Sequence, residues 1–269
     1  METPTGKDRK GVVMFLEFFG TALFVWGILC QNDAIAIPFS LFASVIIFGD
    51  ITGGHFNPAV TLGVYTSLGN YGQNFLFCIL IMLSQFAGGF AAIGLAWAGT
   101  IDIPNSAIGA LAPTNPATGS ADSSAESNDF KMFFPVMVNE VVCTFLFVSV
   151  ILMVKGKYTA GERGGVNAAA CVVATLMCVI SGTNKLGASF NPAVSTGLTT
   201  YSVLRKDIPD GETNQWLYHY LWCYVLGPYI GGLIAGMYHL LAARWFEDEE
   251  TEQREGFHDD QKEGLMSHE

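Results

Sequence analysis

Two copies of one five-residue stretch, Phe56–Val60 and Phe190–Val194, hold residue types that can bind a small polar molecule. Both have the sequence Phe-Asn-Pro-Ala-Val. Asn is favoured at a helix N-cap because its side-chain oxygen accepts a hydrogen bond from a free amide of the first turn. Pro fits the first helical position, where its missing N–H costs nothing. Each copy therefore predicts the start of a helix, with an Asn side chain at the tip that can donate hydrogen bonds to a water or hydroxyl oxygen.

The two helices that these copies begin are predicted to be short. They extend over residues 57–67 and 191–201, where the apolar runs end at about Ser67 and Tyr201. A helix of roughly ten residues is ~15 Å long, which is half of a ~30 Å hydrocarbon core. Two such half-helices in a membrane protein predict two N-termini that meet near the middle of the bilayer.

The composition indicates a protein with several membrane spans. The chain has 269 residues, of which 51% are hydrophobic and 14% are charged, whereas soluble domains carry about 25% charged residues. The net charge of −11 does not describe the fold, because ten of the 24 acidic residues lie between Glu247 and Glu269. The predicted spans cover about 12–30, 34–49, 74–98, 132–154, 166–181 and 215–244.

Residues 12–98 and 132–244 are two copies of one unit. Glu-x-x-Gly-Thr-x-Leu-Phe-Val begins at Glu17, and Glu-x-x-Cys-Thr-x-Leu-Phe-Val begins at Glu140. A Gly-Gly pair also recurs in the third span of each unit, at Gly88 and at Gly231. Each unit has three spans, so the second must enter the membrane with the opposite orientation. This predicts an all-α membrane protein built as an inverted repeat, with a site at the midplane between the halves.

The remaining segments are predicted to lie outside the membrane. Residues 1–11 form an N-terminal arm, 99–131 an extracellular or luminal linker, and 245–269 an acidic, disordered tail. With both termini in the cytoplasm, nine of the 13 Lys and Arg residues fall on the cytoplasmic side, as the positive-inside rule requires.

The paired Asn-Pro-Ala boxes, the Gly-Gly-His-Phe-Asn-Pro-Ala-Val-Thr stretch and Gly-Pro-Tyr-Ile-Gly-Gly resemble the aquaporin, or major intrinsic protein, family. The resemblance implies a right-handed bundle of six transmembrane helices plus two re-entrant half-helices. It implies a homotetramer in the lipid bilayer whose subunits each conduct water and small neutral solutes, without a cofactor, a metal or nucleic acid. The two helix N-termini would repel cations. No cluster of nucleophile, base and orienting group suggests an enzyme.

The resemblance assigns candidate pore residues to numbered positions. The pore motifs are Asn57, Pro58, Ala59, Asn191, Pro192 and Ala193. The outer constriction is Ile37, Val179, Ala188 and Val194, with Val194 where most water-selective relatives have Arg. Without the Arg guanidinium, the outer constriction has no positive charge and no rigid set of N–H donors. This predicts a wider opening that admits glycerol, urea, ammonia or hydrogen peroxide.

Further residues are expected to hold the re-entrant loops or to line the pore. They are Gly53, Gly54, His55, Gly187 and Ser189. Glu17 and Glu140 lie within predicted spans, where an ionisable residue first suggests transport. Their symmetric placement and the family resemblance favour buried structural acids that accept hydrogen bonds from the loop amides.

Three other functions remain open at this point. The protein could be a strict water channel, or a coupled secondary transporter, since inverted repeats also build transporters. The half-helix tips carry only neutral Asn, which argues against a coupling-ion site. A gated or scaffolding membrane protein of low permeability is the third, and its acidic tail would suit a binding partner. The membrane is expected to be the plasma membrane or a vacuole-type internal membrane.

Overall fold

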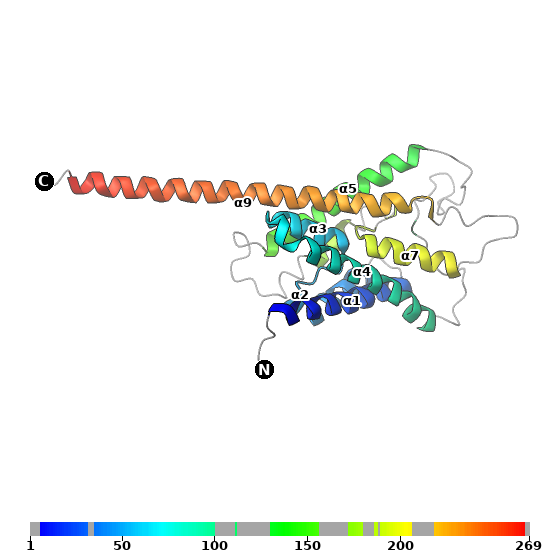
Figure 1. Cartoon of the computed structure of the whole chain (residues 1–269). Helices are drawn as coiled ribbons and strands as arrows, with labels where there is room; N and C mark the ends of the chain where they lie inside the picture. Colours follow the sequence, from blue (N-terminus) through cyan, green and yellow to red (C-terminus); the bar gives the residue numbers. More distant parts are fainter. Residues whose placement is uncertain are drawn as a thin grey trace.

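The computed structural model describes residues 6–31, 35–99, 111, 130–155, 172–179, 186–187, 189–205 and 218–266. Within these ranges every regular element is a helix and no strand occurs. The helices form a bundle, and the last of them extends well beyond it toward the C-terminus (Figure 1).

The first repeat contains four helices in the described chain. They are α1 (Gly6–Gln31), α2 (Ala36–Thr52), α3 (Pro58–Ser67) and α4 (Tyr71–Gly99). Helix α3 has ten residues, half of what a span needs, as the sequence predicts. It follows α2 after a short loop and leads directly into α4, so the chain enters the bundle and returns.

The second repeat has the same order. It contains α5 (Phe130–Lys155), a helical stretch at 172–179, α7 (Pro192–Arg205) and α9 (Leu221–Met266). Helix α7 is the second half-helix, and at 14 residues it is longer than the predicted 191–201. Most of the predicted fifth span, 166–181, lies outside the described residues.

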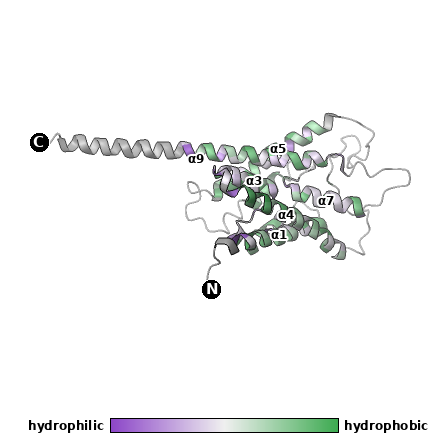
Figure 2. Ribbon diagram, viewed as in Figure 1, coloured by the Kyte–Doolittle hydropathy of each residue, from purple (hydrophilic) through white to green (hydrophobic). Residues whose placement is uncertain are grey.

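Four described helices are long and apolar enough to cross a membrane. These segments are Arg9–Cys30, Asn74–Gly99, Phe133–Val154 and Leu221–Trp245, and Ile37–Thr52 is a shorter apolar helix. Large apolar side chains cover the outside of the bundle, where residues such as Phe75, Leu76, Phe134 and Leu241 are about 60% exposed or more. Figure 2 shows this predominantly hydrophobic colouring over the bundle helices. Such a surface suits the hydrocarbon chains of a bilayer, which offer no hydrogen-bonding groups.

Each half-helix packs against a long helix of the other repeat. Helix α3 of the first repeat packs against α9 of the second, and α7 of the second packs against α4 of the first. Within each repeat the first and third spans also pack together, as α1 with α4 and α5 with α9. Each half-helix therefore lies between the two repeats, and the loops before α3 and α7 are brought together at the centre.

The Gly-Gly pairs make these contacts possible. A Cβ on Gly89 would lie 2.9 Å from the carbonyl oxygen of Ala193 in α7, and a Cβ on Gly232 would collide with the carbonyl of Ala59 in α3. The two glycines occupy equivalent positions in the repeats. Because they carry no side chain, the backbones of half-helix and span approach closely, as is common between membrane helices.

The C-terminal segment differs from the prediction. The sequence predicts a disordered tail over 245–269, but in the structure α9 continues as one helix to Met266 (Figure 1). This stretch has seven Glu and two Gln residues, and both residue types are good helix formers. A helix that is already nucleated in the membrane extends by one hydrogen bond per residue, without a new nucleation step. Charge alone therefore does not predict a disordered backbone after a span.

Candidate functional site

The loops before the two half-helices have an unusual backbone. Phe56 and Phe190, directly before the Asn residues, have φ of 46° and 53° and are the only non-glycine residues with positive φ in the described chain. This left-handed conformation costs roughly 1–2 kcal/mol for an L-residue. Gly53, Gly54 and Gly187 also have positive φ, of 91°, 63° and 69°. The loops therefore need other contacts that hold them in place.

A buried carboxylate holds the first loop. Glu17 of α1 is fully buried, and its two oxygens accept hydrogen bonds from the backbone amides of His55, at 3.0 Å, and Phe56, at 2.8 Å. A third donor is Nε2 of Gln85 in α4, at 2.8 Å. Charge-assisted bonds of this kind are stronger than neutral ones, so they can stabilise the strained conformation of Phe56.

Glu140 of α5 does the same for the second loop. It is fully buried and accepts from the backbone amides of Ser189 and Phe190, both at 2.9 Å. Tyr224 of α9 adds a further link, because its hydroxyl donates to the carbonyl of Leu186 at 2.7 Å. Each acid thus fixes the two residues before an Asn-Pro-Ala box.

The two Asn residues join the repeats at the centre. Nδ2 of Asn57 donates to the carbonyl of Phe190 at 2.8 Å, and Nδ2 of Asn191 donates to the carbonyl of Phe56 at 2.9 Å. These reciprocal bonds form because Phe56 and Phe190 turn their carbonyls toward the opposite loop. Each Asn amide has two N–H donors, so one is used between the loops and a second remains beside the small cavity that both residues line.

The same side chains cap the half-helices. Oδ1 of Asn57 accepts from the amide of Ala59 at 2.8 Å, and Oδ1 of Asn191 accepts from Ala193 at 3.0 Å. Pro58 and Pro192 occupy the first position of α3 and α7. The two helices therefore point their N-termini at each other, and each contributes a partial positive charge of roughly +0.5 at the centre.

The two halves of the centre differ two residues before each Asn. In the first repeat, Nδ1 of His55 lies 3.2 Å from Oγ1 of Thr61, which is also bonded to Gln85. In the second repeat the equivalents are Ser189 and Ser195, whose hydroxyls are hydrogen-bonded to each other. The pore centre is thus bordered by an imidazole on one side and a small hydroxyl on the other.

Ser195 also satisfies a carbonyl that a proline leaves free. Pro228 lies inside α9 and has no N–H, so the carbonyl of Tyr224, four residues earlier, has no helical donor. The hydroxyl of Ser195 donates to this carbonyl at 2.6 Å. The bond ties the half-helix α7 to α9 at the depth of the pore centre.

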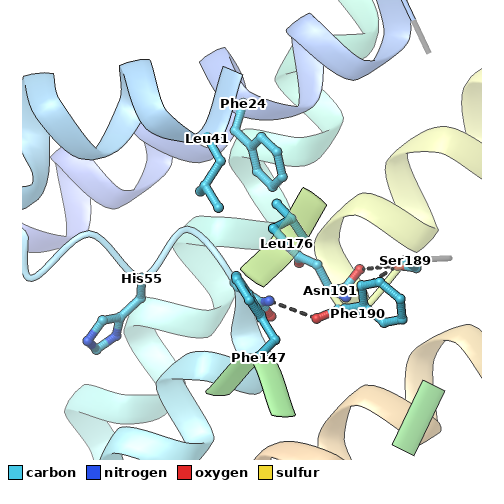
Figure 3. A pocket seen from close by; sticks show the side chains of 9 residues that line it. Phe24, Leu41, His55, Phe147, Leu176, Ser189, Phe190 and Asn191 are labelled. Atoms are coloured by element: carbon cyan, nitrogen blue, oxygen red, sulfur yellow. Dashed lines mark hydrogen bonds between the residues drawn. The ribbon is translucent and has the colours of Figure 1, made fainter. Parts of the chain in front are cut away.

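A small cavity lies beside the paired Asn residues (Figure 3). Counted as positions open to the centre of a water-sized sphere, its volume is about 10 Å³, which is close to the minimum for one water molecule. Its lining is Phe24, Leu41, His55, Asn57, Phe147, Leu176, Ser189, Phe190 and Asn191. Every lining residue except His55 is buried. In Figure 3 the imidazole of His55 lies apart from the aromatic and leucine side chains.

The three described residues of the expected outer constriction are not among those that line this cavity. Val194, the third residue of α7, is 3% exposed, Val179 is 9% exposed, and Ile37 near the start of α2 is half-buried. The fourth member of the ring, Ala188, lies outside the described residues. The selectivity of this ring stays a prediction.

The apolar wall of the cavity, which includes Phe24 and Phe147, is not predicted from the sequence. Both belong to the repeated Glu-to-Val motif, each seven residues after its Glu. Seven residues are about two helical turns, so each Phe lies on the same helix face as the acid that holds a loop. This spacing could have identified the pair as facing the centre of the bundle.

Metal ligands do not gather in the described part of the chain: His, Cys, Asp and Glu form no group of three or more that could hold a metal ion. The polar groups of the centre are amide, hydroxyl, imidazole and backbone groups. They suit hydrogen bonding to a neutral molecule.

Comparison with known proteins agrees with this geometry. A family model described as "Major intrinsic protein" matches residues 12–239. The chain is 28% identical to Aquaporin AqpM of Methanothermobacter marburgensis, over 76% of this chain and 73% of that protein. It is also 28% identical to the Glycerol uptake facilitator protein-like 6 of Lactiplantibacillus plantarum, over 82% of this chain and 89% of the relative.

Among solved structures, the fold is similar to that of the aquaglyceroporin from Plasmodium falciparum. The TM-score is 0.63 with 17% sequence identity, covering 86% of this chain and 95% of the other. Each half-helix packs against the other repeat, the two Asn residues are paired at the centre, and the family model matches most of the chain. These findings lead to one conclusion. This integral, multi-pass membrane protein belongs to the major intrinsic protein family, whose members are membrane channels for water, glycerol or both.

Proposed function

We propose that the protein is a passive channel for water and small uncharged solutes such as urea, ammonia, hydrogen peroxide and glycerol, and that it excludes ions and protons. The observation that carries this proposal is the reciprocal bonding of Asn57 and Asn191 at two facing helix N-termini. A water at this point meets amide donors on one side and apolar side chains on the other. Its oxygen therefore turns toward the amides, and the hydrogen-bonded chain of waters through the pore is interrupted at this point.

Ion exclusion follows from the same arrangement. A cation at the centre faces two positive helix ends in a partly desolvated channel. Among the described residues no acidic side chain lines the central cavity, and Glu17 and Glu140 accept hydrogen bonds from the loop amides. A coupling ion therefore has no negative ligand at this point, which favours a channel over a coupled transporter.

The outer ring sets the breadth of selectivity in this proposal. Ile37, Val179, Ala188 and Val194 offer no charge and no donor fork. The assembly is a homotetramer with a pore in each subunit, and both termini are cytoplasmic. It resides in the plasma membrane or a vacuole-type internal membrane, and the acidic end of α9 is available to a cytoplasmic partner.

Stopped-flow light scattering on proteoliposomes tests this function. Vesicles with wild-type protein and with Val194→Arg are exposed in parallel to gradients of sucrose, urea and glycerol. We expect rapid water flux in both, and solute flux that is lost in Val194→Arg because the guanidinium fills the ring. Water flux without solute flux in the wild type would identify a strict water channel. Flux of neither kind, with protein in the membrane, would favour a gated or scaffolding role.

A further inference from the structure

Tyr224 of α9 makes hydrogen bonds to two separate parts of the second half of the pore. We infer that Tyr224 is a positioning residue, which holds the loop before the second Asn-Pro-Ala box away from the pore and so keeps the channel open to solutes larger than water. This inference rests on the proposed channel function. It adds to it a residue that acts on selectivity without lining the central cavity.

The contacts of Tyr224 connect the loop, the half-helix and α9. Tyr224 is fully buried. Its hydroxyl donates to the carbonyl of Leu186 in the loop at 2.7 Å, and its own carbonyl accepts from the hydroxyl of Ser195 at 2.6 Å. Ser195 lies in the first turn of α7 and is also hydrogen-bonded to Ser189 of the loop. One residue therefore fastens both the loop and the start of the half-helix to the same span.

The first repeat holds its loop with polar side chains that the second repeat does not have. In the first repeat, Gln85 donates to the buried acid of α1 at 2.8 Å, and the hydroxyl of Thr52 accepts from a loop amide at 2.8 Å. Counted from the Gly-Gly pair and from the Asn-Pro-Ala box, the equivalent residues of the second repeat are Pro228 and Leu186. Neither has a polar side chain, so Tyr224 supplies support that the second loop would otherwise lack.

The backbone at Gly187 explains why this support is needed. The carbonyl that Tyr224 binds belongs to the peptide unit between Leu186 and Gly187, and Gly187 has φ of 69°. Glycine adopts positive and negative φ about equally readily, so the local backbone preference does not fix the orientation of this peptide unit. Both residues are half-buried, and water can reach the unit when it turns. The tyrosine hydroxyl therefore selects the orientation in which the carbonyl faces α9.

The position of Tyr224 relative to the cavity gives the direction of the effect. Ser189, Phe190 and Asn191 line the central cavity, whereas Tyr224 binds the same loop and does not line it. The hydrogen bond therefore pulls the loop away from the lumen. Without it, the carbonyl of Leu186 turns to water in the lumen, and the loop narrows the pore. Water still passes, but glycerol, with three linked carbons, is slowed.

Two measurements on full-length protein test this inference. The first is the ratio of glycerol to water permeability in the same proteoliposomes, which does not depend on how much protein is folded and inserted. The second is hydrogen exchange of the peptides that cover residues 186–190, measured in detergent by mass spectrometry. Tyr224→Phe removes the hydroxyl and keeps the buried ring. The matched control is Tyr238→Phe on the same helix, where the exposed ring contacts Phe145 with centroids 6.1 Å apart.

We expect the permeability ratio to fall about tenfold in Tyr224→Phe, which corresponds to a difference of ~1.4 kcal/mol between the two barriers. Exchange of the loop amides should be faster in the same variant, and Tyr238→Phe should match the wild type in both measurements. Ser195→Ala, which releases the carbonyl of Tyr224, should lower the ratio in the same direction.

The outcomes separate this inference from the proposed function. Loop exchange in Tyr224→Phe equal to that of the control, or a permeability ratio that is unchanged or raised, would overturn the inference. Wild-type vesicles that pass water but no glycerol would contradict the proposed breadth of selectivity, and loop exchange would then decide whether Tyr224 holds the loop. Absence of water flux in the wild type would contradict the channel function itself.

Discussion

Replacing Glu140 by Gln should disturb the second re-entrant loop without changing the shape of the buried side chain. The carboxylate accepts one hydrogen bond on each oxygen, from the amides of Ser189 and Phe190. A Gln side chain keeps one acceptor and presents an NH₂ group to the other amide. In either orientation one backbone N–H of the loop loses its partner at a fully buried position.

The magnitude follows from that single loss. A buried donor left without a partner costs ~1–3 kcal/mol. Displacing the loop also relieves the left-handed conformation of Phe190, at φ 53°, which is worth roughly 1–2 kcal/mol. The first contribution alone shifts the balance between native and displaced loop by about 5- to 150-fold. Displacement removes the carbonyl of Phe190 from Asn57, so water permeability should fall.

The assay is osmotic water permeability of proteoliposomes, normalised to folded protein, together with thermal unfolding in detergent. Thr144→Val is the matched control. It lies one turn further along α5, is fully buried, and its hydroxyl has no hydrogen-bond partner within the described residues. Val has a similar shape and no polar group, so the control should be as stable as the wild type or more stable. If Glu140→Gln matches that control in both measurements, the carboxylate does not hold the loop.

Two further predictions concern the contacts around the half-helices. Gly232→Ala places a Cβ against the backbone of α3 and should destabilise the protein by ~1–3 kcal/mol. The control Gly94→Ala, with nothing within 4 Å of the new Cβ, should be neutral or stabilising. Equal unfolding temperatures of the two variants would contradict the close approach of Gly232 to α3. Ser195→Ala leaves the carbonyl of Tyr224 without its donor and should cost ~1–3 kcal/mol. Adding Pro228→Ala restores a helical N–H for that carbonyl, so the double variant should regain part of the loss, and strictly additive effects would exclude the coupling.

The fold could be predicted because the sequence contains it twice. Two Asn-Pro-Ala boxes and two Glu motifs predict three spans and a half-helix in each repeat, and the family match and the helical structure confirm the all-α membrane fold. Local chemistry was enough to predict where α3 begins, since Asn57 is its N-cap. The predicted end of the second half-helix, at 201, comes before the observed end of α7 at Arg205, because a run of Thr, Tyr and Ser gives no clear stop signal.

The details of the pore centre were harder to predict. Spacing shows which helix face Phe24 and Phe147 share with the acids, but their closeness depends on how two separate helices cross. The reciprocal bonds between Asn57 and Phe190 likewise depend on the left-handed turn of the loop, which no local preference of Phe would suggest. The role of Val194 in selectivity stays a prediction, because selectivity is defined by measured permeability to solutes and not by the position of a side chain.

The helical extension of α9 illustrates a different limit. Acidic residues beyond Trp245 predict solvation, and solvation is compatible with either a helix or a disordered chain. The outcome depends on the preceding span, which supplies the nucleated helix. A tail that follows a long helix should therefore be judged by its helix propensity as well as its charge.

The most direct test of the central claim is water flux through wild-type protein compared with an altered Asn pair. Proteoliposomes with the wild type, with Asn191→Leu and without protein are shrunk in a sucrose gradient, at equal protein content. The account predicts flux well above the protein-free vesicles for the wild type, and a large loss for Asn191→Leu, which removes both the helix cap and the donor to Phe56. Wild-type flux no greater than that of bare lipid, or full flux in the folded variant, would contradict it.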